Sequence, residues 1–359
     1  MQPLAKPPRR SIVSSAAAVF LAFAPASFAD AQELEEINIL TSNDQSCSPY
    51  PQIVSDEFGF FAEEGLKVNL LTTNTVVPFV AFLANGEADL VMLKPGQVLH
   101  ASNVGQPVSV IYEAYQGASD GIVVAESSDI KSLADLKGKT VGLSHESARL
   151  ILAIALGTVG LSLDDVSAPV VGDSAPTVAT AINDGSIVGY VAGNTEFAAL
   201  IAAGVPVRNL TPIEISQMPG NSWTVWKPTL EEKRDRFQRF LRAWAKGQHS
   251  GIMDMKAVMS ACRKRIPEQW EVAGRGEAIV NLSVYHTQVR RTLDYGELQR
   301  DVWENIQGPY VDFGEISQTI DIDTFLDSSF IEAANDFTTD DVKKVVKSWK
   351  ESNKDILYN

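Results

Sequence analysis

The chain has 359 residues, of which 45% are hydrophobic and 21% are charged, and its formal net charge is −15 at pH 7. This acidic balance argues against nucleic acid or an anionic membrane surface as a partner, because both attract basic surfaces. The length is ample for two compact domains with separate cores.

The first 31 residues follow the order of a secretory signal. Three basic residues precede an apolar run over residues 12–23, and small residues follow it. The run is too short to span a bilayer comfortably, which disfavours the alternative of a membrane anchor. We therefore expect a signal peptide over residues 1–31, cleaved after Ala29 or Ala31, and a periplasmic protein.

Two cysteines, Cys47 and Cys262, lie far apart in the sequence. Export permits a disulfide between them, and two free thiols remain equally open. Their spacing fits no metal motif, and the four histidines are scattered without a partner at metal-ligand spacing. We predict no metal site and no cofactor.

An internal repeat sets the expected architecture. The order strand, loop, helix, strand, loop, helix, strand occurs over residues 37–93 and again over residues 140–191. Gly86 and Gly185 lie where a helix ends and the chain turns into the next strand, as a left-handed helix cap requires. Apolar strands that alternate with helices predict parallel sheets covered on both faces. The expected strands are residues 37–40, 68–71, 89–93, 140–143, 168–171 and 187–191.

Six loops follow these strands and form the candidate ligand site, because open sheets of this type bind ligands beyond the carboxyl ends of their strands. If the two units face each other, all six loops line one cleft. The loops are residues 41–49, 72–75, 93–97, 144–149, 172–176 and 192–196.

The junction over residues 140–149 is the most informative loop. An apolar strand gives way to small polar residues, and an apolar helix follows over residues 149–156. The start of a helix presents unpaired N–H groups, which can hold an anionic or polar ligand group. In the alternative interpretation, Ser144 and Ser147 only cap the helix.

Four stretches resemble signature sequences of the periplasmic solute-binding proteins of ABC importers: residues 59–68, 83–90, 105–111 and 132–142. The nearest group in that family binds nitrate, taurine, aliphatic sulfonates or the pyrimidine precursor of thiamine. The resemblance covers roughly residues 37–210 and is less specific for the ligand than for the family.

The resemblance implies an α/β protein of the two-lobed, type II periplasmic-binding-protein fold, with two doubly wound sheets joined by two crossover strands. It also implies hinge closure over one solute, and a membrane permease with its ATPase as partners. Lobe 1 would comprise residues 32–116 plus 229–359, and lobe 2 residues 117–228. The two crossings would lie near residues 112–116 and 223–228.

The C-terminal third reads as helical. A helix is expected to open at Thr229 and to carry Phe237, Phe240, Leu241 and Trp244 at helical spacing, where they are expected to form core. Residues 323–326 and 339–349 have acidic first turns and one apolar face each, so we expect further helices that pack on lobe 1.

Candidate ligand contacts are polar or aromatic residues on the six loops and at the first crossing. Tyrosines there could stack on a flat solute or pack in the hinge, and Lys94 is a cation near the expected cleft. A carboxylate such as Asp173 would be unfavourable beside an anion. The candidates are Asn43, Asp44, Tyr50, Thr73, Asn74, Thr75, Lys94, Tyr115, Ser144, His145, Ser147, Asp173, Ser174 and Asn194.

We predict a monomeric binding protein, not an enzyme, that captures a small organic anion (a sulfonate or carboxylate) for an ABC importer. Ser144, His145 and Glu146 are adjacent in the sequence and are not expected to converge as a catalytic group. A nitrogenous heterocycle of the thiamine-pyrimidine type is the second solute class, favoured by Tyr50, Tyr115 and the carboxylates. An enzyme acting on such a heterocycle and a sensor domain that signals to a membrane kinase remain open.

Overall fold

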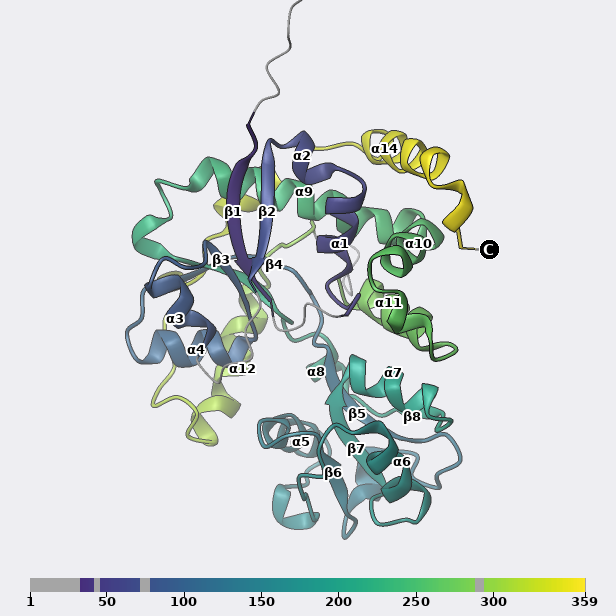
Figure 1. Cartoon of the computed structure of the whole chain (residues 1–359). Coiled ribbons are helices and arrows are strands. Elements are labelled where there is room, and N and C mark those ends of the chain that lie inside the picture. Colours follow the sequence, from purple (N-terminus) through teal and green to yellow (C-terminus); the bar gives the residue numbers. More distant parts are fainter. Residues whose placement is uncertain (1–32, 42–45, 72–77, 288–293, 359) are drawn as a thin grey trace, which may run out of the picture. The chain divides into compact units, whose positions relative to one another are not determined.

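The computed structural model describes residues 33–41, 46–71, 78–287 and 294–358. The expected signal peptide and five candidate site residues, Asn43, Asp44, Thr73, Asn74 and Thr75, lie outside this part. Residues Leu34–Asn359 form one compact unit with two sheets (Figure 1). The strand order is β2-β1-β3-β9-β4 in the first sheet and β6-β7-β5-β8 in the second.

The first sheet is mixed rather than parallel. Strand β1 runs parallel to β2 and β3, whereas β9 runs antiparallel between β3 and β4. The repeat strands β1, β2 and β3 are parallel, as expected, whereas β9 lies outside the repeat and makes the sheet mixed because it returns from the second sheet in the opposite direction. The strands are β1 (Glu35–Leu40), β2 (Leu66–Leu71), β3 (Leu90–Leu93), β4 (Val108–Glu113) and β9 (Ser222–Trp226).

The second sheet is also mixed. Strands β6 (Val141–Leu143) and β7 (Gly189–Gly193) are parallel, and β5 (Asp120–Ala125) is antiparallel to β7 and to β8 (Val207–Asn209). The expected strand over residues 168–171 forms one isolated bridge with β6, between Leu143 and Val170. Pro169 explains the difference, because it has no N–H with which to extend a ladder.

Side-chain alternation along the strands sends apolar residues to both faces of each sheet. Leu90 and Met92 of β3 join the hydrophobic cluster beneath α1 (Tyr50–Glu57), α2 (Phe60–Glu63) and α9 (Arg234–Met253). Val91 and Leu93 join the cluster that includes α3 (Phe79–Ala84) and α4 (Pro95–Asn103). In the second sheet, α5 (Ala148–Gly157) lies on one face, and α6 (Ala175–Asn183) and α7 (Asn194–Ala202) lie on the other (Figure 1). The expectation of sheets covered on both faces is confirmed.

The helices follow the predicted order with small shifts at their ends. Gly86 and Gly185 end α3 and α6 with positive φ angles of 73° and 78°, as predicted. Those that follow strands of the repeat are α1 (Tyr50–Glu57), α2 (Phe60–Glu63), α3 (Phe79–Ala84), α4 (Pro95–Asn103), α5 (Ala148–Gly157), α6 (Ala175–Asn183), α7 (Asn194–Ala202) and α8 (Ile213–Ser216). The C-terminal helices are α9 (Arg234–Met253), α10 (Met255–Arg265), α11 (Arg275–Thr287), α12 (Arg300–Asp312), α13 (Ile331–Ala334) and α14 (Thr339–Ser352).

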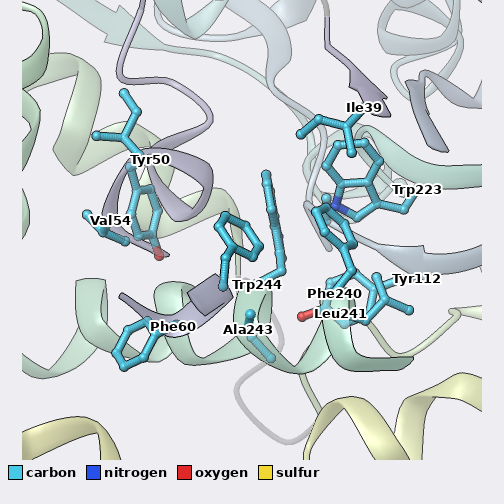
Figure 2. Close-up of a cluster of buried hydrophobic side chains, with 14 of the residues drawn as sticks. Ile39, Tyr50, Val54, Phe60, Tyr112, Trp223, Phe240, Leu241, Ala243 and Trp244 are labelled. Atoms are coloured by element: carbon cyan, nitrogen blue, oxygen red, sulfur yellow. The ribbon is translucent and has the colours of Figure 1, made fainter. Parts of the chain in front are cut away.

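Helix α9 contributes many side chains to the hydrophobic cluster that it shares with α1, α2 and the first sheet (Figure 2). Phe237, Phe240, Leu241 and Trp244 are fully buried, which confirms their prediction as core. The ring of Trp223 on β9 meets Trp244 edge-on, with ring centroids 4.9 Å apart. Return strand and helix therefore pack as one aromatic cluster.

Two expected helix bounds were wrong. The helix expected to open at Thr229 begins at Arg234, because residues 227–229 form a separate short 3-10 turn that contains Pro228. Residues 322–324 also form only a 3-10 turn, capped by the Asp321 side chain, in place of a helix at 323–326. Helix α14 matches the prediction, and the Thr338 hydroxyl caps it by accepting from the Asp341 N–H.

Candidate ligand-binding site

A pocket of about 260 Å3, here called the polar pocket, lies at the ends of strands from both sheets. Lys94 follows β3, Tyr115 follows β4, and Asn194 follows β7. Strands β5 and β9 run in the opposite direction, so their first residues reach the same edges: Asp120 pairs with Gly193, and Ser222 pairs with Leu93. The lining residues are Thr41, Ser48, Pro49, Met92, Lys94, Tyr115, Ser119, Asp120, His145, Gly193, Asn194, Thr195, Glu196 and Asn221.

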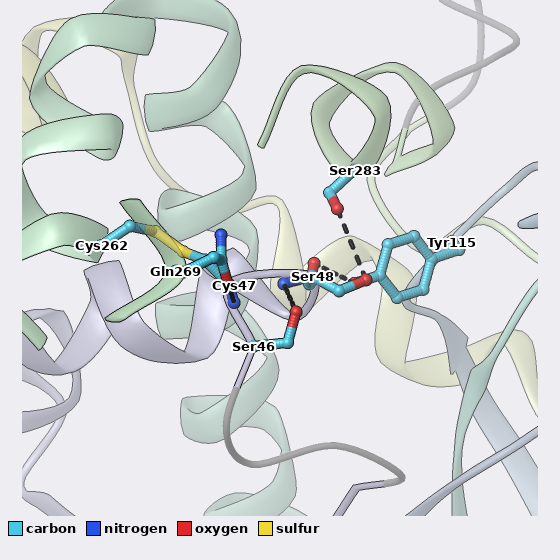
Figure 3. Close-up of a disulfide and its surroundings, with 7 residues drawn as sticks. All are labelled: Ser46, Cys47, Ser48, Tyr115, Cys262, Gln269 and Ser283. Carbon is cyan, nitrogen blue, oxygen red and sulfur yellow. Dashed lines mark hydrogen bonds between the residues drawn. A yellow bond between two sulfur atoms is a disulfide. The ribbon is translucent and has the colours of Figure 1, made fainter. Parts of the chain in front are cut away.

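The side of the polar pocket formed by residues 46–49 and Tyr115 is called the first wall, and it is anchored to the core (Figure 3). Cys47 and Cys262 form a disulfide that ties this segment to α10, with 5.9 Å between their Cα atoms. The Cys47 N–H donates to Gln269 Oε1 at 2.8 Å. The structure thus decides for the disulfide over the two free thiols.

Tyr115 completes the first wall. Its hydroxyl donates to the Ser48 carbonyl oxygen at 2.5 Å (Figure 3). Burial raises the pKa of this hydroxyl, which keeps it protonated as a donor. The hydroxyl is therefore committed to the protein, and the ring is what Tyr115 offers to a ligand.

Lys94 and Asp120 form an ion pair between the end of β3 and the start of β5. The Lys94 ammonium lies 2.8 Å from Asp120 Oδ2 and 3.0 Å from Oδ1. The side chains are 43% and 21% exposed, so the pair contributes only about 0 to 1 kcal/mol to stability. Its more important effect is on charge, because Asp120 neutralises Lys94, which is the one lysine among the described residues that line the polar pocket.

Glu196 gives the polar pocket a second carboxylate. Its Oε2 accepts a hydrogen bond from the Gly193 N–H at 3.1 Å, at the start of α7. The lining residues therefore include one lysine and two carboxylates, together with the neutral polar side chains of Asn194 and Asn221. An anion placed here would meet a local excess of negative charge.

His145 and residues 193–196 also line the polar pocket, and together with Ser147, which contacts His145 but is not a lining residue, they are here called the second wall. The Ser147 hydroxyl hydrogen-bonds His145 Nδ1 at 2.6 Å, and both side chains are exposed. Ser147 precedes α5 but makes no side-chain cap bond, which differs from the capping interpretation. Ser144 is buried beneath them, with 6% of its surface exposed.

The other charged residues of this junction face each other. The Arg149 guanidinium pairs with the Glu146 carboxylate, Nη2 to Oε2 at 2.8 Å, and also donates to the Ala168 carbonyl. Arg149 is therefore occupied outside the polar pocket. The expectation that Ser144, His145 and Glu146 do not converge holds for Glu146, whereas His145 contacts Ser147 directly.

The remaining candidates lie apart from the polar pocket. Tyr50 is fully buried on α1, and its hydroxyl donates to the Gln248 carbonyl at 2.9 Å. Asp173 and Ser174 are exposed before α6 and do not line the polar pocket. Lys94, Tyr115, His145 and Asn194 are the candidates that line it.

Several lining residues were missed from the sequence. Asp120 begins β5 and Asn221 precedes β9, and both strands are antiparallel, whereas the expected site comprised only loops that follow strands. Thr41, Ser48 and Glu196 lie within the predicted loops but were not singled out, because neither spacing nor residue type distinguished them. Recognising the two crossing strands as antiparallel would have identified Asp120 and Asn221.

A buried histidine lies near the crossing. His286 on α11 is 9% exposed, and its carbonyl accepts from the Gly117 N–H at 3.2 Å. Burial lowers the pKa of its side chain to about 4, and the negative charge of Asp120 opposes this shift. His286 is therefore neutral near pH 7.

A second, larger cavity of about 780 Å3 adjoins the polar pocket, and Lys94, Asp120 and His145 line both. Its wall comes mainly from α3, α4, α5 and α12. Within the described residues, no group of three or more metal-ligating side chains comes together. No helix in that part of the chain is long and apolar enough to cross a membrane.

Comparison with known families gives a match over residues 49–254, more than half of the chain, to the family described as NMT1/THI5 like. One curated relative is the 4-amino-5-hydroxymethyl-2-methylpyrimidine phosphate synthase of Uromyces fabae, 27% identical over 173 residues. That match covers 47% of this chain and 46% of the relative, so the chain spans less than half of the relative's length.

A second relative is the riboflavin-binding protein RibY of Chloroflexus aurantiacus, 22% identical over 240 residues, with 66% of this chain and 68% of the relative covered. Among solved structures, the periplasmic aliphatic sulphonate binding protein SsuA of Escherichia coli superposes with a TM-score of 0.65 at 15% identity. That superposition covers 81% of this chain and 91% of SsuA, and it shows a shared fold.

Proposed function

The chain belongs to the NMT1/THI5-like family, and from that premise we propose that it is the extracytoplasmic solute-binding component of an ABC importer. The shared fold with SsuA supports this role. In this proposed role the protein is exported and monomeric, and it delivers its solute to a permease with an associated ATPase. Residues 32–116 plus 229–359 and residues 117–228 would be the two moving lobes.

The proposed solute is a small nitrogenous heterocycle with N–H donors, and the charge of the polar pocket carries this choice. Asp120 is paired with Lys94, so the charges of these two side chains offset each other. Glu196 is the second carboxylate of the lining, and it can accept hydrogen bonds from amino groups of the solute. The amides of Asn194 and Asn221 can both donate to ring nitrogens and accept from N–H groups. The ring of Tyr115 supplies an aromatic face for a flat solute.

This proposal favours the second of the two solute classes expected from the sequence. A sulfonate or carboxylate would need Lys94 to leave Asp120, or would have to be held by neutral dipoles beside two carboxylates. The pocket volume of about 260 Å3 suits a single-ring solute, since pockets for drug-sized ligands begin near 300 Å3.

Binding and closure would be coupled through the composition of the polar pocket. Its residues come from both sheets, so one solute contacts both proposed lobes at once. Such a solute binds most tightly to the arrangement in which both sets of contacts form, and it shifts the population toward that state. The permease would recognise this state.

Replacing Asp120 by Asn tests the proposed solute class. The variant replaces a carboxylate of the polar pocket by a neutral amide, which accepts hydrogen bonds from amino groups more weakly, and it leaves Lys94 without the charge of its partner. A 4-aminopyrimidine should bind about tenfold more weakly, and an alkanesulfonate should bind more tightly than to the wild type. Isothermal titration calorimetry measures both, and Asp173→Asn, outside the polar pocket, is the matched control.

The opposite pattern would reject the heterocycle. If the wild type binds the sulfonate tightly and ignores the aminopyrimidine, the proposed solute class is wrong, whatever the variants do. An unchanged affinity for both solutes in Asp120→Asn would remove Asp120 from the site.

An enzyme acting on a heterocycle is the second candidate. The hydrogen bond between Ser147 and His145 favours it, because a serine beside a histidine base is a potential nucleophile. The synthase of Uromyces fabae is a relative with a name that denotes an enzyme. Mass spectrometry of an aminopyrimidine after incubation with the protein separates the two functions, because only an enzyme changes the mass of the solute.

A further inference from the structure

The cavity next to the polar pocket, here called the apolar cavity, is three times as large and differs in character, with about 780 Å3 against 260 Å3. Much of its wall is apolar, and this part comes from helices that pack on either sheet. The apolar side chains include Phe79 on α3, Leu150 and Ile151 on α5, and Tyr310 on α12. Polar side chains such as Gln106 and Glu315 also line it.

One close contact and one exposed side chain characterise this wall. Gly96 lies so close to Tyr310 that a Cβ atom there would come within 2.8 Å of the ring, so the tyrosine lies flush against α4. Val104, at the end of α4, is 54% exposed although it is apolar. An apolar group that filled the cavity would remove such surface from water.

The two cavities adjoin at the ion pair. Lys94, Asp120 and His145 belong to the linings of both, so a molecule in the polar pocket can extend past these side chains into the apolar cavity. A single ring fills only the smaller space. A ligand that uses both therefore has a polar end and an apolar end.

We propose that the apolar cavity binds an alkyl or aryl substituent of the same solute whose nitrogenous ring occupies the polar pocket. This inference rests on the proposed function and specifies its solute as an amphipathic, substituted heterocycle. The polar ring determines recognition, and the substituent adds affinity by burial against Phe79, Ile151 and Val104.

A homologous series of ligands tests the proposal with the intact protein. The probes are 4-aminopyrimidines that carry a methyl, ethyl, propyl or butyl group at ring position 5, measured by isothermal titration calorimetry. Affinity should rise about fourfold for each methylene that the cavity buries. The ratio of the methyl to the butyl Kd is the readout.

Val104→Asp places a carboxylate in the apolar cavity and should lower that ratio at least tenfold, because an apolar chain does not compensate for a partly buried charge. Val159→Asp is the matched control, since Val159 is also an exposed valine, 40% exposed, and lies outside the cavity. The control should keep the wild-type ratio.

The outcomes separate this inference from the proposed function. If the methyl compound binds and the butyl compound binds no better, the apolar cavity is not used, while the proposed function stands. If the ratio falls equally in both valine variants, the inference is also wrong. If no member of the series binds the wild type, both proposals fail.

Discussion

The two walls of the polar pocket are built in different ways. The first wall is tied to the core by the disulfide, by the bond from Cys47 to Gln269, and by the bond from Tyr115 to Ser48. The second wall carries His145 and Ser147, which are exposed and hydrogen-bond each other. The first wall is thus anchored by a disulfide and by hydrogen bonds to the core, whereas the contact between His145 and Ser147 in the second wall is exposed to solvent.

Opening the disulfide should have the largest effect on this contrast. The disulfide joins residues that are 215 positions apart, and it reduces the conformational entropy of the unfolded chain. The double variant Cys47→Ser/Cys262→Ser loses this constraint, so its free energy of unfolding should fall by about 4 kcal/mol. Urea denaturation of the variant and of the wild type, each with and without a reducing agent, measures this loss.

The first wall should loosen in the same variant, so solute affinity should fall together with stability. The reduced wild type should behave like the double variant, and the double variant should not respond to reductant. A wild-type denaturation midpoint that is insensitive to reduction would show that the disulfide contributes little to anchoring the first wall.

Helix α11 supports the first wall, because its Ser283 hydroxyl hydrogen-bonds the Ser48 hydroxyl (Figure 3). The same helix carries His286, so we expect acid to destabilise this support. The pKa of His286 is about 4 in the folded protein and ordinarily 6.5, so the unfolded chain binds more protons between these values. Stability should therefore fall as pH drops from 6.5 to 4, by about 3 kcal/mol at most.

Urea denaturation at pH 7 and pH 4 measures this effect. His286→Gln should remove that part of the pH dependence, and His100→Gln, at an exposed histidine, should keep it. An equal pH dependence in the wild type and in His286→Gln would assign the acid sensitivity to other groups.

The smallest effect is expected at the second wall. Ser147→Ala removes the hydroxyl that hydrogen-bonds His145, and solute affinity should fall by about 1 kcal/mol or less, roughly fivefold. The free energy of unfolding should stay unchanged, because both side chains are exposed. Ser174→Ala, at another exposed serine that precedes a helix, is the control for calorimetric titration.

A large loss of unfolding free energy in Ser147→Ala would contradict the contrast between the walls. It would mean that the second wall is held by folding as firmly as the first. An unchanged solute affinity in Ser147→Ala would show that the hydrogen bond from Ser147 to His145 does not contribute to solute binding.

Local patterns in the sequence were sufficient for the fold class and for most elements. The apolar pattern placed the strands of the repeat except the one expected over residues 168–171, and it placed the buried residues of α9. Glycine marked the ends of α3 and α6. These features depend on a few neighbouring residues, so they can be recognised without knowledge of distant contacts. The family resemblance was confirmed for the same reason, because its motifs are short and continuous.

The pocket depended on tertiary structure. The directions of β5 and β9 brought Asp120 and Asn221 to it. The pairing of Asp120 with Lys94 is the reason that we propose a heterocycle in place of the small organic anion expected from the sequence. Tyr50 was taken into the core by α9 and α11, where its hydroxyl has partners. Strand direction, ion pairing and burial each join residues far apart in the chain, so the sequence determined the elements while the tertiary structure decided the chemistry of the site.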